Sequence, residues 1–256
     1  TGTAIPAGRS RELDLVLSRW EQARSGQGQG VLISGEPGIG KSRLMRELGD
    51  RLGAEPHTWL EARCTEDSSG QAYAPVVDLL TRMLDPNRDL PPEGRLTGLE
   101  ALLSGYSFEL PETLPLFASL LSLPLPPERW APLDVSPLKH RELTRNALLA
   151  FLAAMAERHP VVLALEDLHW ADPSTLELLK ALVEEVSSSR LLALFSARPE
   201  LEPPWAASAV TQVQLGALAR AEVERRAAAA AGGPLSPEAL EEIATRTDGI
   251  PLFVEE

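Results

Sequence analysis

The feature that most constrains the fold of this chain is a glycine-rich stretch between a short apolar run and an amphipathic segment. The stretch reads Gly35-Glu36-Pro37-Gly38-Ile39-Gly40-Lys41-Ser42. The apolar run at 31–34 has the length of a buried strand, and Leu44, Leu48 and Leu52 then recur at helical spacing. We therefore predict a strand, a tight loop and a helix in direct succession.

This succession of elements, with this loop sequence, favours the binding of phosphate groups; residues 35–42 are called the phosphate loop below. Glycines let successive backbone N–H groups point inward around an anion, and the following helix adds its own unpaired N–H groups. The pattern G-x-x-x-x-G-K-[ST] predicts that Lys41 reaches the β- and γ-phosphates of a nucleotide and that Ser42 binds Mg²⁺. The alternative is a plain glycine turn, but with only three lysines in the chain a chance match is rare. The expected nucleotide contacts are Gly35, Glu36, Pro37, Gly38, Ile39, Gly40, Lys41, Ser42 and Arg43.

A second polar feature stands at the end of another apolar run, 161–165, which is followed by Glu166 and Asp167. Nucleotide sites of this kind need one carboxylate near the metal and usually another that polarises the attacking water. Neighbouring residues of a strand point to opposite faces, so the two acids are expected to have different roles. We assign Glu166 to the Mg²⁺ side together with Ser42, and Asp167 to the position of the catalytic base. The alternative is that one acid only ends the strand or caps the next turn.

The residues that follow these acids are interpreted as structural. Asp172 precedes a proline and a helical pattern, so we predict that it caps a helix. His169 and Trp170 are expected to be packed rather than catalytic.

Strand-like and helix-like segments alternate along the chain, which predicts an α/β fold with a parallel sheet covered on both faces. Strands are expected at 31–34, 57–64, 161–165, 191–197 and 211–215, and Ser10 is expected to cap a first helix that ends near Arg24. Ten of the 22 prolines lie between Pro86 and Pro137 among many leucines, so we predict an insertion of short helices and turns at 85–136. The predicted domains are a nucleotide-binding domain at 1–215 and a truncated helical subdomain at 216–256.

Composition excludes several other classes of protein. The formal charge of −13 disfavours nucleic acid as a direct partner. The longest apolar run has ten residues, about half of what a membrane helix needs. The single cysteine, Cys64, fits a reducing compartment, so we expect a cytoplasmic location. A chain that begins at Thr1 without a signal peptide is expected to be part of a longer protein.

Three motifs in this order resemble one family. They are the phosphate loop, the run Glu166-Asp167-Leu168-His169-Trp170-Ala171-Asp172 and the run Gly249-Ile250-Pro251-Leu252-Phe253-Val254-Glu255-Glu256. Together they resemble the AAA-related P-loop ATPase domain of the STAND class (signal-transduction ATPases with numerous domains). The most similar branch is the bacterial one found in large LuxR-type regulators and in cyclase or kinase fusions. The resemblance extends from Gly8-Arg9 to the C-terminus and is weakest across the insertion.

The resemblance implies a three-layer sandwich and further site residues. The sheet would have five strands, with the strand at 191–197 between the phosphate-loop strand and the acidic strand. Arg198 would sense the γ-phosphate, although a surface arginine is the alternative. Gly8 and Arg9 would lie beside the adenine, and Pro251 would pack on the base unless it only starts a helix. Many members carry aspartate at the position of Glu166, which leaves direct or water-mediated contact with Mg²⁺ open.

Three functions compete, and the sequence separates them only in part. The first is a switch that binds ATP and hydrolyses it slowly to ADP and phosphate, with no assured arginine finger although Arg225, Arg226 and Arg246 are available. The second is a nucleotide-gated scaffold with negligible turnover, for which the same residues would serve. The third, a kinase acting on a small acceptor, is disfavoured because no acceptor lid is found. Expected partners are ATP, DNA-binding, cyclase or kinase domains of a parent chain, and further copies of the domain.

Overall fold

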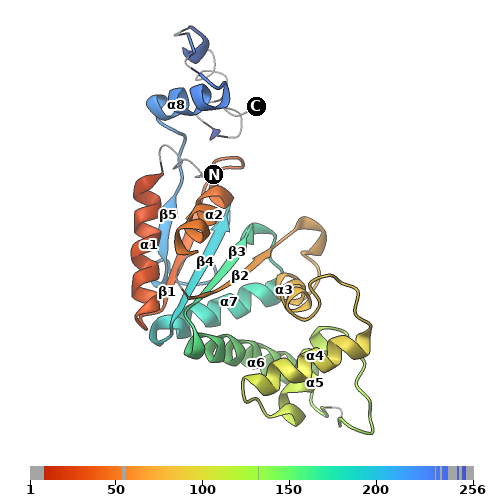
Figure 1. The fold of residues 1–256 in the computed structure, drawn as a ribbon. Coiled ribbons are helices and arrows are strands. Elements are labelled where there is room, and N and C mark those ends of the chain that lie inside the picture. The colour runs from red at the N-terminus through yellow and green to blue at the C-terminus, as the bar shows by residue number, and fades with distance from the viewer. Residues whose placement is uncertain are drawn as a thin grey trace.

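The fold is a five-stranded, fully parallel sheet with helices on both faces (Figure 1). The strands are β1 (Gln29–Ser34), β2 (Thr58–Arg63), β3 (Val161–Glu166), β4 (Leu191–Ala197) and β5 (Thr211–Gln214). Their order is β2-β3-β4-β1-β5, so β4 separates β1 from β3 as predicted. The computed structural model describes residues 9–53, 56–131, 133–233, 235, 236, 238–241, 247, 250 and 251.

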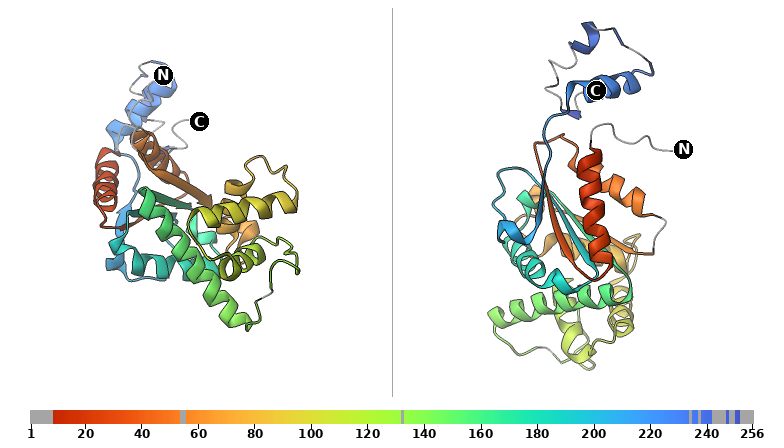
Figure 2. Two further views of the ribbon diagram at one scale, coloured as in Figure 1. Left: turned by 60° about the horizontal axis from the view of Figure 1, so that its bottom comes forward. Right: turned by 90° about the vertical axis from the view of Figure 1, so that its left-hand side faces the viewer.

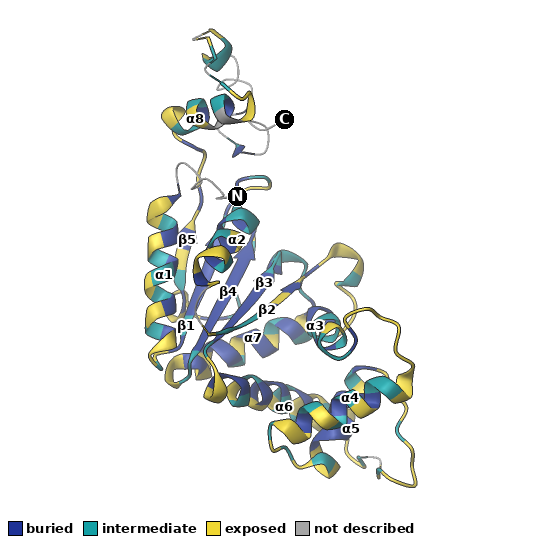
Figure 3. Cartoon of the chain, viewed as in Figure 1, coloured by how far each residue is buried: buried dark blue, intermediate teal, exposed yellow. Residues whose placement is uncertain are grey.

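Burial along the strands explains their positions in the sheet. All seven residues of β4 and the first five of β3 are buried, as expected for central strands with helices on both sides. In the edge strands β2 and β5, most residues are exposed or half-buried. In Figure 3 the central strands are accordingly dark along their length.

Two helices cover one face of the sheet. They are α1 (Ser10–Arg24) and α2 (Lys41–Leu52), and their inward side chains, Trp20 and Leu48 among them, form an apolar cluster with residues of β1, β3 and β4. This group is called the α1–α2 cluster below. The expectation that Ser10 caps α1 is wrong. Ser10 is the first helical residue, Arg9 occupies the capping position, and no side chain among the described residues bonds to the free N–H groups there.

The opposite face of the sheet is covered by other helices (Figure 2). Their apolar side chains form a larger cluster with the sheet, called the insertion-side cluster below. Three helices lie directly against this face: α3 (Ala74–Leu84), α6 (Pro137–Arg158) and α7 (Pro173–Glu185). The proline-rich stretch forms α4 (Pro92–Gly105) and α5 (Leu110–Leu120), which pack on each other, while α5 also packs on α6. Leucines such as Leu99 and Leu114 are fully buried there, so the stretch is packed structure as predicted.

After β5 the chain passes to a separate small cluster. Leu218, together with Val223 and Ala227 of α8 (Arg220–Ala230), is buried there, and α8 lies beyond the edge at which the strands end (Figure 1). Of the helical subdomain predicted at 216–256, residues 234, 237, 242–246, 248, 249 and 252–256 lie outside the described residues. The described residues also form short 3₁₀ turns at Glu66–Ser68, Leu168–Trp170, Val186–Ser188 and Ala207–Ala209. In the described part of the chain, no helix has the length and apolar character that a membrane span requires.

Candidate active site

The phosphate loop connects β1 to α2 at the edge where the parallel strands end. Gly38 (φ 75°) and Gly40 (φ 103°) adopt left-handed backbone conformations that a residue with a Cβ rarely takes. Gly35 is needed for a different reason, since a Cβ there would lie 2.8 Å from the carbonyl oxygen of Leu215. No side chain of the described residues caps α2, which begins at Lys41. The N–H groups of its first turn can therefore face an anion.

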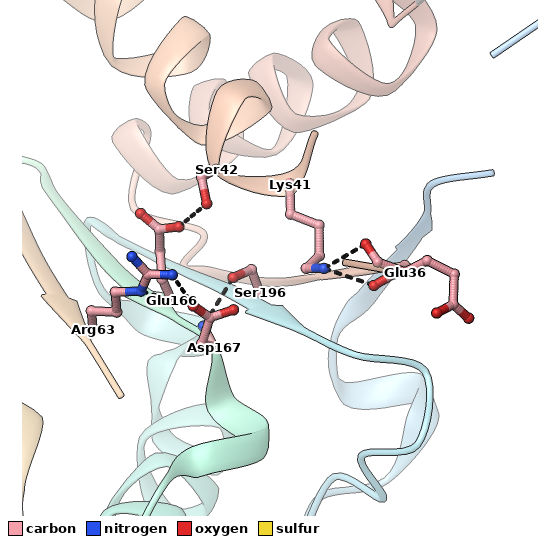
Figure 4. Close-up of polar contacts among 8 residues, drawn as sticks. Glu36, Lys41, Ser42, Arg63, Glu166, Asp167 and Ser196 are labelled. Atoms are coloured by element: carbon pink, nitrogen blue, oxygen red, sulfur yellow. Dashed lines mark hydrogen bonds and ion pairs between the residues drawn. The ribbon is translucent and has the colours of Figure 1, made fainter. Parts of the chain in front are cut away.

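Lys41 lies folded over its own loop (Figure 4). Its Nζ donates to the carbonyl oxygens of Gly35 at 2.7 Å and Glu36 at 3.0 Å. Burial lowers the pKa of Lys41, and the nearby Arg198 lowers it further, while Asp167 and Glu36 oppose the shift. Phosphate oxygens carry charge and are stronger acceptors than these two carbonyls. A bound phosphate would therefore attract the ammonium group away from the loop.

Ser42 and Glu166 meet although they are 124 residues apart in the chain. Glu166 ends β3 and its side chain points toward the α2 side, where the Ser42 hydroxyl donates to the carboxylate (Figure 4). Mg²⁺ prefers oxygen ligands and commonly keeps phosphate oxygens and waters in its shell rather than a full protein cage. A hydroxyl and a carboxylate in contact at the end of the phosphate loop fit this ion. These two residues would hold it.

Asp167 directly follows Glu166, but its side chain is oriented by a backbone turn and not by the alternation of a strand. The strand ends at Glu166, and Asp167 has a left-handed backbone (φ 58°) instead of a strand conformation. Its backbone N–H donates to the buried Ser196 hydroxyl at 3.1 Å. The two carboxylates are thus separated by a turn, and the argument from strand alternation was wrong for Asp167. An aspartate held in this conformation at the end of a strand is typical of a functional site.

Arg63 is a site residue that the sequence analysis missed. Its Nε and Nη2 both lie 2.8 Å from Oδ2 of Asp167, and this bonding raises the pKa of the guanidinium. Arg63 ends β2 and pairs in register with Glu166, which brings it to the same edge as the acids. The available signal was its place at the end of a predicted strand, but only the strand order shows that β2 lies beside β3.

Arg198 and His169 both lie near the charged group of Lys41. Arg198 directly follows β4, and its guanidinium carbon is 5.8 Å from the ring centre of Trp170. Burial lowers the pKa of His169, and the positive charges of Arg198 and Lys41 lower it further, while Asp167 raises it. His169 Nδ1 is buried without a hydrogen-bond partner among the described residues. A neutral, packed histidine agrees with the structural interpretation given to it.

Asp172 caps α7, as predicted, and its carboxylate also bonds to a residue outside that helix. It is 2% exposed, and its carboxylate accepts from the backbone N–H and the hydroxyl of Thr175. The same carboxylate accepts from the backbone N–H of Tyr73 at 3.0 Å. Asp172 thereby joins the start of α7 to the start of α3.

The remaining predicted site residues lie on several elements. Arg9 is buried, and its side chain bonds to the carbonyl oxygens of Ile39 and Gly216. Arg43 is half-buried in α2. Pro251 is buried, and Ile250 before it packs against the α1–α2 cluster. Gly8, Arg246 and the side chain of Arg226 lie outside the described part of the structure, whereas Arg225 is exposed and donates to the carbonyl oxygen of Ala221.

The structure thus brings Lys41, Ser42, Glu166 and Asp167 to one edge of the sheet. Residues 6–195 match the family described as the AAA ATPase domain. The chain belongs to this family. The expected relation to AAA-type P-loop ATPases is confirmed.

Comparison with individual proteins finds matches to parts of longer chains. The chain is 28% identical over 254 residues to an uncharacterized protein of Rhizobium meliloti (strain 1021), covering 97% of this chain but only 24% of that protein. It shares its fold with a STAND protein of Pyrococcus horikoshii that has a tetratricopeptide repeat sensor. That comparison covers 99% of this chain and 30% of the other, with 16% identity and a TM-score of 0.51. A RuvB mutant of Thermotoga maritima also matches, at 13% identity over 96% of this chain and 59% of that one, with a TM-score of 0.44.

Proposed function

We propose that this domain binds ATP with Mg²⁺ at the phosphate loop and hydrolyses it slowly to ADP and phosphate, as a signalling switch within a larger protein. One observation carries the proposal: the phosphate loop, the Ser42–Glu166 pair and Asp167 share one edge of the sheet. In open parallel sheets, ligands bind at the edge where the strands end. Family membership supports an ATPase, and the local geometry supplies the residues.

Each residue has a role that follows from its position. The loop N–H groups and Lys41 bind the β- and γ-phosphates, and Ser42 and Glu166 hold the ion, whose charge offsets that of the phosphates. Asp167 orients a water and accepts its proton while the water oxygen forms a bond to the γ-phosphorus. The bond between the γ-phosphorus and the bridging oxygen breaks, and ADP leaves with that electron pair. In the same proposal, Arg198 senses the γ-phosphate.

One observation favours the alternative of a scaffold with negligible turnover. Nε of Arg63 donates to Oδ2 of Asp167, and Nη2 lies 2.8 Å from the same oxygen, so this oxygen is already engaged. A carboxylate oxygen that already accepts from a guanidinium is less available to orient a water. Hydrolysis would then await a change that releases Asp167, which is consistent with slow turnover in the isolated domain.

The wider role rests on the length of the relative and on the fold neighbour. The chain spans about a quarter of the Rhizobium protein and less than a third of the STAND protein. We infer that the domain regulates an effector domain, of the DNA-binding, cyclase or kinase type, in a longer cytoplasmic protein. Self-association with nucleotide bound belongs to the same proposal. Contact of Gly8 and Arg9 with the adenine, and of Pro251 with the base, also remains proposed.

The proposal is tested by titrating Mg²⁺-ATP into the protein in a calorimeter and following phosphate release. We compare wild type, Lys41→Ala and the control Lys180→Ala, which removes an exposed lysine of α7. Lys41→Ala should weaken binding by roughly a hundredfold, because charge-assisted contacts to phosphate are lost. Wild type should turn over on the order of once per minute or less.

The outcomes separate the alternatives. Equal affinities of wild type and Lys41→Ala would exclude the phosphate loop as the site. Tight binding with no phosphate release above the Lys41→Ala background would support the scaffold. Loss of binding in Lys180→Ala as well would show that the assay reports general damage to the fold.

A further inference from the structure

Arg9 connects two segments that are far apart in the sequence. Its Nη2 donates to the carbonyl oxygen of Ile39 in the phosphate loop at 3.4 Å and to the carbonyl oxygen of Gly216 after β5. Its Nη1 lies 3.3 Å from the Glu12 carboxylate. The side chain is only 10% exposed, so these bonds are largely shielded from solvent. One guanidinium therefore holds the loop and the chain leaving the sheet together.

The contact with Ile39 bears on phosphate binding through the geometry of a single peptide. In a planar trans peptide, the C=O and the N–H point in opposite directions. Arg9 holds the Ile39 carbonyl on one side, so the Gly40 N–H points to the other. Gly40 has a left-handed backbone, and glycine gives this peptide more rotational freedom than other residues would. Arg9 therefore restricts the direction of an amide that forms part of the phosphate cradle.

The contact with Gly216 lies at the junction of two apolar clusters. Leu215 belongs to the α1–α2 cluster, and its backbone N–H donates to the Ser34 carbonyl at 2.8 Å. Leu218 belongs to the small cluster of α8. Only Gly216 and Ala217 lie between these leucines, and a Cβ at Gly216 would meet no atom within 4 Å. The Arg9 bond therefore restrains the segment where the chain changes from one cluster to the other.

The burial of Arg9 also indicates that its contacts do more than stabilise the fold. A buried guanidinium is costly unless its donors are matched, yet Nε of Arg9 is buried without a partner among the described residues. Two of its three contacts are backbone carbonyls from separate segments, and the carboxylate contact is long. A purely structural arginine would gain more from a close, two-bond carboxylate partner.

We propose that Arg9 is a positioning residue that couples the phosphate loop to the Gly216–Ala217 linker. A phosphate bound at the Gly40 N–H polarises the Ile39–Gly40 peptide and makes its carbonyl a better acceptor. Arg9 is then held more firmly, and so is Gly216. Occupancy of the loop is thereby transmitted to α8. The coupling deepens the proposed nucleotide switch and rests on it for the identity of the ligand.

Hydrogen exchange read by mass spectrometry tests the coupling in two stages. The variants are Arg9→Gln and the control Arg11→Gln, which changes an exposed arginine of α1. Without nucleotide, Arg9→Gln should speed exchange in peptides covering both 35–42 and 215–219 by about tenfold, the factor for one lost bond to a charged group. Peptides of α5 and α6 should exchange as in wild type, and so should every peptide of Arg11→Gln.

In the second stage, Mg²⁺-ATP is added. In wild type we expect protection of both 35–42 and 215–219, whereas in Arg9→Gln the nucleotide should protect 35–42 but no longer 215–219. If Arg9→Gln does not fold, Arg9→Lys serves instead, because the lysine side chain is one bond shorter, so its ammonium would not reach both carbonyls that Nη2 contacts. Unchanged exchange at 215–219 without nucleotide, or equal protection of 215–219 by ATP in both proteins, overturns the coupling. Absence of ATP binding in wild type overturns the nucleotide function, while the first stage still decides whether Arg9 joins the two segments.

Discussion

On one face of the sheet, α1 and α2 cover a small apolar cluster that includes Trp20 and Leu48; on the other, five helices cover a much larger cluster built around Phe117 and Phe151. The phosphate loop is continuous with the smaller side, where Ile39 is buried and Glu166 points toward Ser42. The larger side contributes no nucleotide contact predicted from the sequence. The predicted nucleotide contacts and most of the buried apolar side chains therefore belong to opposite faces of the sheet. Substitutions in the phosphate loop should alter nucleotide binding and hydrolysis, whereas substitutions in the larger cluster should alter the free energy of unfolding.

The largest expected effect is on the rate of hydrolysis. Asp167→Asn should slow phosphate release from bound ATP by about 10²–10⁴-fold, because the proton acceptor is lost while the phosphate cradle remains. Affinity for ATP should stay close to that of wild type, measured by calorimetry. Glu166→Gln should instead reduce the Mg²⁺ dependence of binding. Identical behaviour of the two variants in both assays would show that the acids do not have separate roles.

The second prediction concerns the contribution of the insertion-side cluster to stability. Phe117 in α5 is 2% exposed, and its ring centre lies 5.8 Å from that of Phe151. Phe117→Ala should lower the free energy of unfolding by about 3–5 kcal/mol, measured by urea denaturation. Under conditions where the variant is still folded, its ATP affinity should match that of wild type. A variant that is stable but has lost affinity would contradict the separation of the two faces.

The third prediction concerns Asp172, which joins the starts of α3 and α7 on the larger side. Asp172→Ala removes the acceptor of two backbone N–H groups, those of Tyr73 and Thr175, in a site that is 2% exposed. We expect a loss of about 2–4 kcal/mol in the free energy of unfolding, because buried donors are left without partners and a helix cap is lost. Asp172→Asn keeps one carbonyl acceptor and should lose less. Equal losses in the two variants would show that hydrogen bonding at this position is not the cause.

The smallest expected effect is on the pH dependence of the free energy of unfolding. Burial lowers the pKa of His169 below its ordinary value of 6.5, so the folded protein disfavours the protonated form. The stability that depends on neutral His169 is therefore present above pH 6.5 and is lost as the pH falls through that value toward the pKa of the folded state. Urea denaturation of wild type and His169→Gln between about pH 7 and about pH 5 should show a shallower decline in the variant. Parallel declines would exclude His169 as a source of the pH dependence.

Much of the fold was predictable because the sequence signals are local. The glycine loop and the apolar runs of the strands depend on neighbours within a few residues, and the prolines at the starts of α6 and α7 mark those helices directly. The positions of Lys41 and Ser42 at the start of α2 could be predicted for the same reason, since loop and helix are adjacent in the sequence.

The contacts that were missed all join segments distant in sequence. Arg63 meets Asp167 only because β2 packs beside β3, and no pattern near either residue encodes that order. Arg9 was expected near an adenine, and its bonds to Ile39 and Gly216 could not be predicted from an α1 motif. The left-handed backbone of Asp167 depends in turn on Ser196 of a neighbouring strand. Tertiary contacts decide the orientation of these side chains.

The strand order also has a consequence for how the protein is made. The neighbours of Val31 in the finished sheet are Leu194 and Thr211, so β1 has no partner until the chain has grown by more than 160 residues. At usual rates of synthesis this takes roughly ten seconds or more. Throughout that time an apolar strand with unpaired backbone groups must be kept from aggregating, and such long-range pairing folds slowly. The moment at which the nascent chain can first hold a phosphate is therefore set by β4 and β5, and not by the loop that will bind it.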